Sequence, residues 1–372
     1  MNEKTQKDFK AVKEKSAVSR FLNFVGTENI SLMIALVALV LLITVVSGWV
    51  GLEGGDKFFT WQNLLNSLAQ AIVIVGLLSM GETIVALGGF MDISIGSIAS
   101  CGSVAAASAL AGSGAIGSLH IFPQNNVFWS IVAGILVGVV AGIINGLIVT
   151  KLYVNATVAT LGTMAAYAGA AFLLAPDGKP ISVATQQGFT WLAQGRLLKS
   201  WNILPLNGSK WTGIPVLTVI LLIVVIIMHV VMRYTSFGRA VYALGGNATA
   251  ARLSGIDVDS MRIKMFMISG GISGLAGVLL ASRTTSGNPI NGQGLEMQAM
   301  TAVYLGGTST SGGKGTIFGT FLAVIIVGVL NNGMNLLGFN TFVQKIALGL
   351  LLVIAVAISQ YRVMHAEKAR KS

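Results

Sequence analysis

The chain has 372 residues, of which 54% are hydrophobic and 10% are charged, and its mean hydropathy is +0.79. Soluble domains carry about 25% charged residues, and a soluble monomer this apolar would expose larger hydrophobic patches than monomers tolerate. The apolar residues form continuous runs of membrane-spanning length, so the sequence predicts a polytopic membrane protein. The runs do not alternate every second residue, which favours helices over a β-barrel.

The formal net charge is +11, and the places of the basic residues matter more than their sum. Most of them lie in the first 29 residues, in the segment Arg233–Lys264 and in the C-terminal tail. The positive-inside rule places these segments on the cytoplasmic side. The basic excess therefore indicates orientation, and we expect no nucleic-acid partner. The single cysteine, Cys101, lies among small apolar residues, so we expect a packing role and no disulfide framework.

Apolar runs predict about ten transmembrane helices, so the expected fold class is an all-α polytopic membrane protein. The runs are Ile30–Val50, Leu64–Leu87, Ile95–Ala111, Val127–Thr150, Ala156–Leu174, Pro215–Met232, Ile263–Ser282, Leu295–Leu305, Thr316–Leu336 and Thr341–Gln360. Three parts follow: a basic cytoplasmic N-terminal segment (1–29), a transmembrane domain (30–360) with a cytoplasmic coupling segment (233–262), and a basic cytoplasmic tail (361–372). We expect both termini in the cytoplasm.

Two stretches of the sequence match each other across the chain. Gly142 and Asn145 correspond to Gly328 and Asn331, and each stretch continues into a similar run, Asn155–Val158 or Asn340–Val343. The predicted topology gives the two helix pairs opposite orientations, as in the inverted repeats of transporters. Chance similarity between two Gly- and Leu-rich spans is the alternative.

Polar residues at the repeated helix starts offer donors and acceptors without fixed charge, which suits a neutral polyhydroxylated ligand. The predicted translocation pathway therefore consists of Asn155, Thr157, Thr160, Asn340, Thr341 and Gln344. For Asn145 and Asn331 we expect hydrogen bonds between helices and no ligand contact.

Three acidic residues, Glu82, Asp92 and Glu296, lie within or beside the spans. Asp92 and Glu296 each stand where a helix begins after a glycine-rich break, so the preferred interpretation is structural: a carboxylate there accepts free backbone N–H groups. Coupling of transport to protons or cations through Asp92 or Glu82 is the alternative.

Two further motifs do not support an enzyme. The segment Gly306–Gly315 lacks the glycine and hydroxyl positions of a phosphate-binding loop. Ser273 stands in a GxSG pattern typical of intramembrane serine proteases, but only His229 is conceivable as its base, so helix packing is favoured. No histidines stand at metal-ligand spacing, so we expect no metal site.

The cytoplasmic segment 233–264 contains signals for a short helix. Asn247 is a good N-cap, Ala250 and Ala251 are strong helix formers, and Gly255 is a stop signal. A helix of about two turns between glycines suits docking into a groove of a partner; an ordinary linker is the alternative.

Three motifs resemble the permease subunits of ATP-binding-cassette monosaccharide importers, in the ribose/galactose/xylose branch. They are FGRAVYALGGNATAARLSGI (Phe237–Ile256), GGFMDISIGS (Gly88–Ser97) and LGGTSTSGGKGTIFGT (Leu305–Thr320). Two departures stand out. Thr249 replaces the family's Glu, and one extra residue separates Gly89 from Asp92.

The resemblance implies a permease of the bacterial inner membrane that pairs with a second permease copy or homologue, two ATPase domains and an extracytoplasmic sugar-binding protein, in membrane lipid. ATP and magnesium are then expected on the ATPase, with no cofactor on this chain. The implied ATPase-coupling residues are Gly245, Gly246, Asn247, Thr249, Ala250, Ala251, Arg252 and Gly255. Two alternatives stay open: an ion-coupled secondary transporter, and an importer of this type for a nucleoside or a furanosyl signalling molecule.

Glycine accounts for 46 residues, and three of its clusters lie beside the cytoplasm, at 88–89, 245–246 and 306–315. We expect tight turns or hinges at these places, while the glycines within the spans allow helices to pack closely.

Overall fold

A computed structural model describes residues 27–49, 58–201 and 203–371. Eight helices of these segments are long and apolar enough to cross a membrane, and a further apolar helix is shorter, which confirms the all-α polytopic class. The long helices are α3 (Thr27–Trp49), η1 with α4 (Gln62–Leu68 and Ala69–Leu87), α5 (Ile95–Ala111), α7 (Val127–Lys151), α8 (Ala156–Leu174), α10 (Val216–Tyr234), α13 (Val258–Thr284) and α15 (Ile317–Leu336). Residues 1–26 of the predicted basic N-terminal segment lie outside the described residues.

The remaining elements are shorter or extend beyond the apolar runs. The helices are α6 (Gly114–Ser118), η2 (Pro176–Gly178), α9 (Gln187–Gln194), α11 (Ser236–Gly246), α12 (Ala248–Leu253), α14 (Leu295–Leu305) and α16 (Thr341–Lys371). The strands are β1 (Ile181–Ser182), β2 (Arg196–Leu197), β3 (Ile214–Pro215) and β4 (Ser286–Gly287), paired antiparallel as β1 with β4 and β2 with β3.

The helix boundaries differ from the prediction mainly at the start of α13 and at the end of α16. Helix α13 begins at Val258 rather than Ile263, because the Asp257 carboxylate accepts a hydrogen bond from the Ser260 N–H at 3.1 Å and caps the helix. Helix α16 continues to Lys371, beyond the predicted end at Gln360. An apolar run marks only the part of a helix that lies in lipid, so it does not locate such polar extensions.

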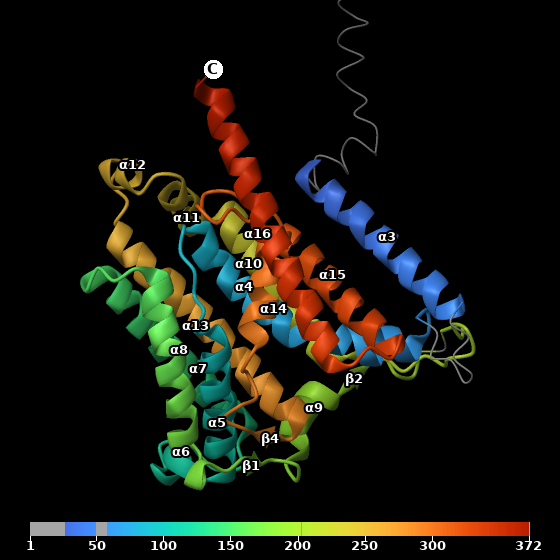
Figure 1. Ribbon diagram of the computed structural model, residues 1–372. Coiled ribbons are helices and arrows are strands. Elements are labelled where there is room, and N and C mark those ends of the chain that lie inside the picture. The colour runs from blue at the N-terminus through green and yellow to red at the C-terminus, as the bar shows by residue number, and fades with distance from the viewer. Residues whose placement is uncertain (1–26, 50–57, 202, 372) are drawn as a thin grey trace, which may run out of the picture.

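Burial decides which helices form the centre of the bundle. The most apolar stretch of α5 is 89% buried, whereas that of α3 is 6% buried. Helix α3 lies at the edge of the bundle and packs against α15 (Figure 1). The most apolar stretches of the spans that contain α4 and α13 are each 72% buried. These two helices pack against each other and complete the centre of the bundle.

Two sets of helices repeat the same packing scheme. Helix α5 packs against α7, α8 and α13, while α14 packs against α15, α16 and α4. Helix α7 also packs on α13, as α15 does on α4. Figure 1 shows α8 and α16 running in opposite directions. These pairings are those that the predicted inverted repeat requires.

Glycines bring α7 and α13 into backbone contact. A Cβ atom built on Gly138 would meet the carbonyl oxygen of Gly270, and one on Gly142 would meet that of Phe266. One on Gly146 would lie 2.8 Å from the Cα of Ile263. Small residues at this spacing let two membrane helices approach until their backbones touch.

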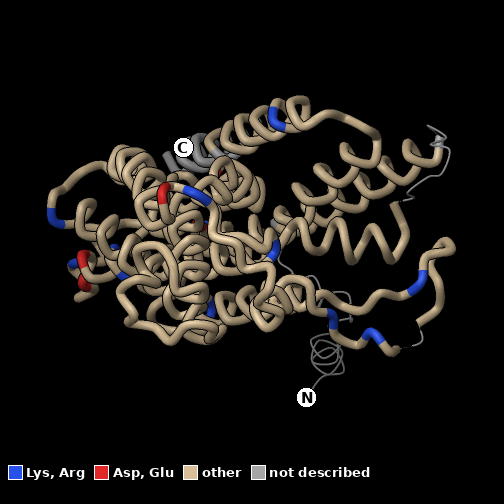
Figure 2. The backbone as a smooth tube through the Cα atoms, turned by 90° about the horizontal axis from the view of Figure 1, so that it is seen from below, with Lys and Arg blue, Asp and Glu red and all other residues tan. Residues whose placement is uncertain are grey.

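The long connection between α8 and α10 folds onto the bundle at the end opposite α12. Its helix α9 packs on α13, where the Ser282 hydroxyl donates to the carbonyl of Phe189 at 2.7 Å. The indole of Trp61 donates to the carbonyl of Leu204 at 2.9 Å. Figure 2 shows how sparse the charges are, since most of the tube is neither basic nor acidic.

Candidate translocation and coupling sites

A cavity of ≈ 340 Å³ lies where α7, α8 and α13 meet the loop after α4. Its lining is Gly89, Phe90, Met91, Val149, Tyr153, Val154, Asn155, Ala156, Thr157, Arg262, Tyr304 and Thr310. Two predicted pathway residues, Asn155 and Thr157, thus lie at a cavity, and the Asn155 side chain also caps α8 by accepting from the Thr157 N–H at 3.0 Å. The amide group of Asn155 keeps donors for a ligand.

The other predicted pathway residues lie elsewhere. Thr160 is buried, where its hydroxyl accepts from the Ile93 N–H at 3.2 Å and donates to the carbonyl of Ala156 at 2.9 Å. Asn340, Thr341 and Gln344 lie at the start of α16, at the opposite end of the bundle from α8's first turn (Figure 1). The single chain does not bring the two groups together.

Sequence patterns did not point to the charged and aromatic groups of the cavity. The guanidinium of Arg262 lies 5.3 Å from the centre of the Phe90 ring, a cation–π contact. Tyr304 is 3% exposed and contributes a phenol to the wall. These three residues are far apart in the sequence, so no local motif links them.

Behind the cavity lies a buried polar network centred on Asp92, which is 0% exposed. Its backbone N–H donates to the carboxylate of Glu82 at 3.1 Å, and its own carboxylate accepts from the Ser94 hydroxyl at 2.6 Å. The side-chain amide of Asn145 donates to the Ser94 oxygen at 2.8 Å, and the Tyr167 hydroxyl lies 3.1 Å from the Asn145 carbonyl oxygen. The network joins α4, α7 and α8 to the start of α5.

We expect Asn145→Ala to lower the free energy of unfolding by about 1–3 kcal/mol, because it leaves buried hydrogen-bonding groups of the network without partners. Thermal unfolding of the purified permease in detergent measures this. Asn331→Ala is the matched control, since Asn331 makes one long hydrogen bond to Gln298 at 3.4 Å and its own carbonyl oxygen has no partner. Equal losses in both variants would contradict the role assigned to the network.

Glu296 holds the start of α14. Its carboxylate accepts from the N–H of Gly294 at 3.1 Å, and a Cβ on Gly96 would meet the same side chain. Carboxylates thus lie at the starts of α5 and α14, where the backbone leaves donors free.

The predicted short helix between Asn247 and Gly255 is present as α12. The Asn247 side chain caps it by accepting from the Ala250 N–H at 2.9 Å, and Gly255 after its end has a φ of 84°, in the left-handed region that glycine favours. Thr249 is exposed, and Leu253 at the helix end is 85% exposed. An exposed leucine beside small residues is a natural anchor for a partner's groove; sequence analysis overlooked it.

The structure brings the glycine clusters at 88–89, 245–246 and 306–315 together in one junction. A Cβ on Gly245 would meet the carbonyl oxygen of Leu87 and lie 2.5 Å from the backbone nitrogen of Gly313. That nitrogen donates to the same Leu87 oxygen at 2.8 Å. A Cβ on Gly312 would lie 2.7 Å from the Cα of Gly89. Three backbone segments are in contact here, so the glycines serve close packing at this place.

Tyr242 of α11 adds a side-chain hydrogen bond to this junction. Its hydroxyl donates to the carbonyl of Gly315 at 2.9 Å. Burial raises the pKa of Tyr242, so the phenol keeps the proton that this hydrogen bond requires. Helix α11 is therefore held to the loop between α14 and α15.

Ser273, the candidate nucleophile, is fully buried and its hydroxyl donates to the carbonyl of Ser269 on the same helix at 2.9 Å. A serine nucleophile requires a base that accepts its proton, and this backbone contact is instead the one expected of a serine in a packed membrane helix.

Comparison with known proteins identifies the type of protein. The family described as branched-chain amino acid transport system / permease component matches residues 63–356. The ribose import permease of Bacillus subtilis is 38% identical over 299 residues, 80% of this chain and 84% of that permease. The ribose import permease of Escherichia coli K12 is 34% identical over 87% of this chain and 92% of its own length. The L-arabinose transport system permease of the same strain is 33% identical over 85% of this chain and 87% of its own length. No solved structure gave a significant match.

Proposed function

Because this chain belongs to the branched-chain amino acid transport permease family and is the membrane permease of an ATP-binding-cassette sugar importer, we propose that its substrate is a pentose. The observation that carries this proposal is the 38% identity to a ribose import permease over 80% of the chain. Ribose import permeases of further bacteria and an L-arabinose permease are also similar, and both sugars are pentoses.

The cavity supports a sugar as substrate. Its volume of ≈ 340 Å³ falls in the range of small-molecule sites, about 300–1,000 Å³. Its wall combines aromatic faces (Phe90, Tyr153) with hydrogen-bonding groups (Asn155, Thr157). Aromatic faces contact the C–H surfaces of a sugar, and the polar groups bind its hydroxyls. The cavity is the inner part of the proposed pathway.

A second copy of the permease, or a homologue, would complete the pathway. Asn155 precedes α8 and Asn340 precedes α16, and both residues are exposed. The starts of the two helices lie at opposite ends of the bundle (Figure 1). One chain therefore does not enclose them. In the proposed dimer these helices face the partner, so that the two groups of polar residues line one path from each side.

The proposed ATPase contact is α11 with α12, at the end of the bundle where α16 projects (Figure 1). The exposed Thr249, Ala250 and Leu253 form its surface. ATP and magnesium belong to the ATPase in this proposal, and closure of the ATPases pushes α12 as a rigid body. The firmly packed glycine junction transmits this push to α4 and to the loop between α14 and α15.

The proposal places the chain in the bacterial inner membrane with both termini in the cytoplasm. The connection between α8 and α10 then faces outward, and its packing on α13 makes it a firm surface for a sugar-binding protein. The basic residues Arg233, Arg239 and Lys151 lie on the cytoplasmic side, as the positive-inside rule requires.

We expect proteoliposomes containing the permease, its ATPase and its binding protein to accumulate labelled ribose only when ATP reaches the ATPase. Competition with unlabelled L-arabinose, a hexose and a nucleoside ranks the substrates. Strong competition by the nucleoside and none by pentoses would overturn the substrate proposal. Uptake that continues without the ATPase and collapses with an ionophore would establish the ion-coupled alternative instead.

A further inference from the structure

We propose that Asp259 and Arg262 form a relay between the docking helix α12 and the inner cavity, and that Arg262 gates this cavity. The inference rests on the proposed function, in which α12 contacts the ATPase. It assigns a positioning role to three charged residues that the motifs did not single out as a group.

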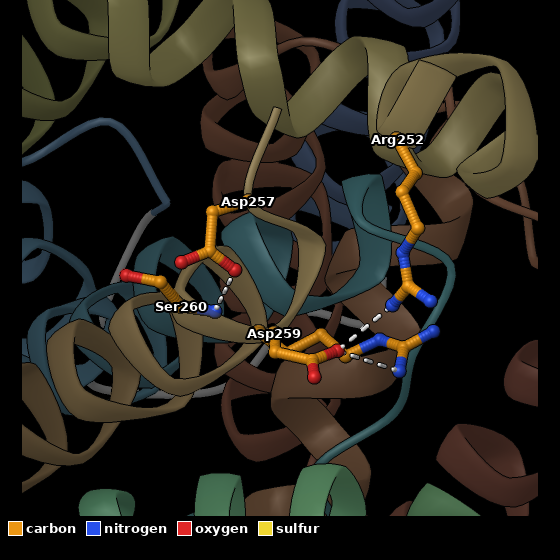
Figure 3. Close-up of polar contacts among 5 residues, drawn as sticks. Arg252, Asp257, Asp259 and Ser260 are labelled. Atoms are coloured by element: carbon orange, nitrogen blue, oxygen red, sulfur yellow. Dashed lines mark hydrogen bonds and ion pairs between the residues drawn. The ribbon is translucent and has the colours of Figure 1, made fainter. Parts of the chain in front are cut away.

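A single carboxylate oxygen serves two arginines. The Arg252 Nη2 of α12 lies 3.1 Å from the Asp259 Oδ1, and the Arg262 Nη1 lies 3.8 Å from the same atom (Figure 3). The first contact has hydrogen-bond geometry, while the second is an ion pair only. Asp259 is thus bound more closely to α12 than to its neighbour on α13.

Exposure falls along this row of charges. The side chains of Arg252, Asp259 and Arg262 are 64%, 32% and 21% exposed. The row therefore leads from the docking surface into the protein. Water screens the charges less toward the inner end of the row. The electrostatic interaction between Asp259 and Arg262 is therefore the most sensitive to a change in a neighbouring charge.

Arg262 is held loosely at the inner end. It stacks over Phe90 and lines the cavity, and its buried Nε has no hydrogen-bond partner. Within the described residues, the guanidinium makes an ion pair and a ring contact but no hydrogen bond. A guanidinium offers five donors in a rigid fork, so its Nη2 group, which makes no contact with Asp259, remains for sugar hydroxyls in the cavity.

The shared oxygen gives the relay two arrangements. With α12 in the present position, Arg252 takes the hydrogen bond of Asp259 and Arg262 stays over Phe90. When the ATPase displaces α12, Arg252 withdraws and Asp259 draws Arg262 into a full hydrogen bond, away from Phe90. The cavity wall then changes at Arg262. Two discrete arrangements that both sites bias are the physical basis of coupling.

The test is the number of sugar molecules transported per ATP hydrolysed by the complete transporter in proteoliposomes. We expect Asp259→Asn to lower this ratio about fivefold, the lower end of typical coupling between sites, while ATP hydrolysis continues. Asp259→Glu restores the carboxylate and should recover most of the ratio. Asp257→Asn is the matched control: Asp257 only caps α13, and asparagine caps equally well.

A double-mutant cycle separates a relay from independent local effects. Asp259→Asn and Arg262→Gln together should lower the ratio no more than either alone, because both interrupt the same path. If Asp259→Asn does not assemble with the ATPase, Arg252→Gln at the exposed end serves instead, with the same expected loss.

The relay is overturned if Asp259→Asn, or Arg252→Gln in its place, transports as much sugar per ATP as the wild type. It is also overturned if the control Asp257→Asn loses as much transport per ATP as Asp259→Asn does. Failure of the proposed function gives a different result, since the wild-type protein would then show no ATP-dependent uptake at all.

Discussion

Gly245→Ala should lower ATP-driven uptake by about tenfold or more, equivalent to at least ~1.4 kcal/mol, although it adds only a methyl group. The new Cβ would meet the carbonyl oxygen of Leu87 and lie 2.5 Å from the Gly313 nitrogen. These two groups form a hydrogen bond of 2.8 Å. Backbone atoms cannot rotate aside as a side chain would, so the segment α11–α12 must shift away from the bundle and lose its contact there.

Gly246→Ala is the matched control for this prediction. A Cβ on Gly246 has no atom within 4 Å, and both glycines end α11. The control should therefore keep uptake near the wild-type rate. Uptake by proteoliposomes with ATPase and binding protein measures the effect, and co-purification with the ATPase shows whether docking is lost. Similar uptake by the two variants would contradict a junction made by backbone contact at Gly245.

Gly138→Ala should lower the free energy of unfolding by about 3 kcal/mol, the upper end for over-packing. Its Cβ would meet the carbonyl oxygen of Gly270 and lie 2.8 Å from the Cα of Gly274. Both atoms belong to the backbone of α13, so α7 and α13 must separate along their whole interface. The surfaces that separate face lipid and not water, so no hydrophobic free energy is lost. The destabilisation comes from lost van der Waals contacts between the two helices.

Gly162→Ala on α8 provides the control, because a Cβ there has no neighbour within 4 Å. Alanine is a better helix former than glycine by about 1 kcal/mol, so this variant should be as stable as the wild type or slightly more so. Thermal unfolding of both variants in detergent measures the difference. A stable Gly138→Ala protein would show that the helices do not pack through these glycines.

The sequence by itself determined the long apolar helices of this protein and the short helix α12. Apolar runs located α5, α8 and α14 to the residue, since each of these runs ends at a glycine, a cap or a polar break. The short helix α12 followed from Asn247 and Gly255. These features depend on neighbours along the chain, and local physical chemistry is sufficient to predict them.

Only the tertiary structure decided which residues meet. Three glycine clusters, at which the sequence predicted tight turns or hinges, form one packed junction, because helix packing brings together segments far apart along the chain. The same packing places Arg262 over Phe90 in a cavity with Asn155, while it leaves Asn340 at the other end of the bundle. Hydropathy and spacing describe each span relative to the membrane; they carry no information on which face of one helix contacts another. Contacts between distant segments depend on side-chain shape and backbone approach in three dimensions, so the cavity and the relay emerge from the fold alone.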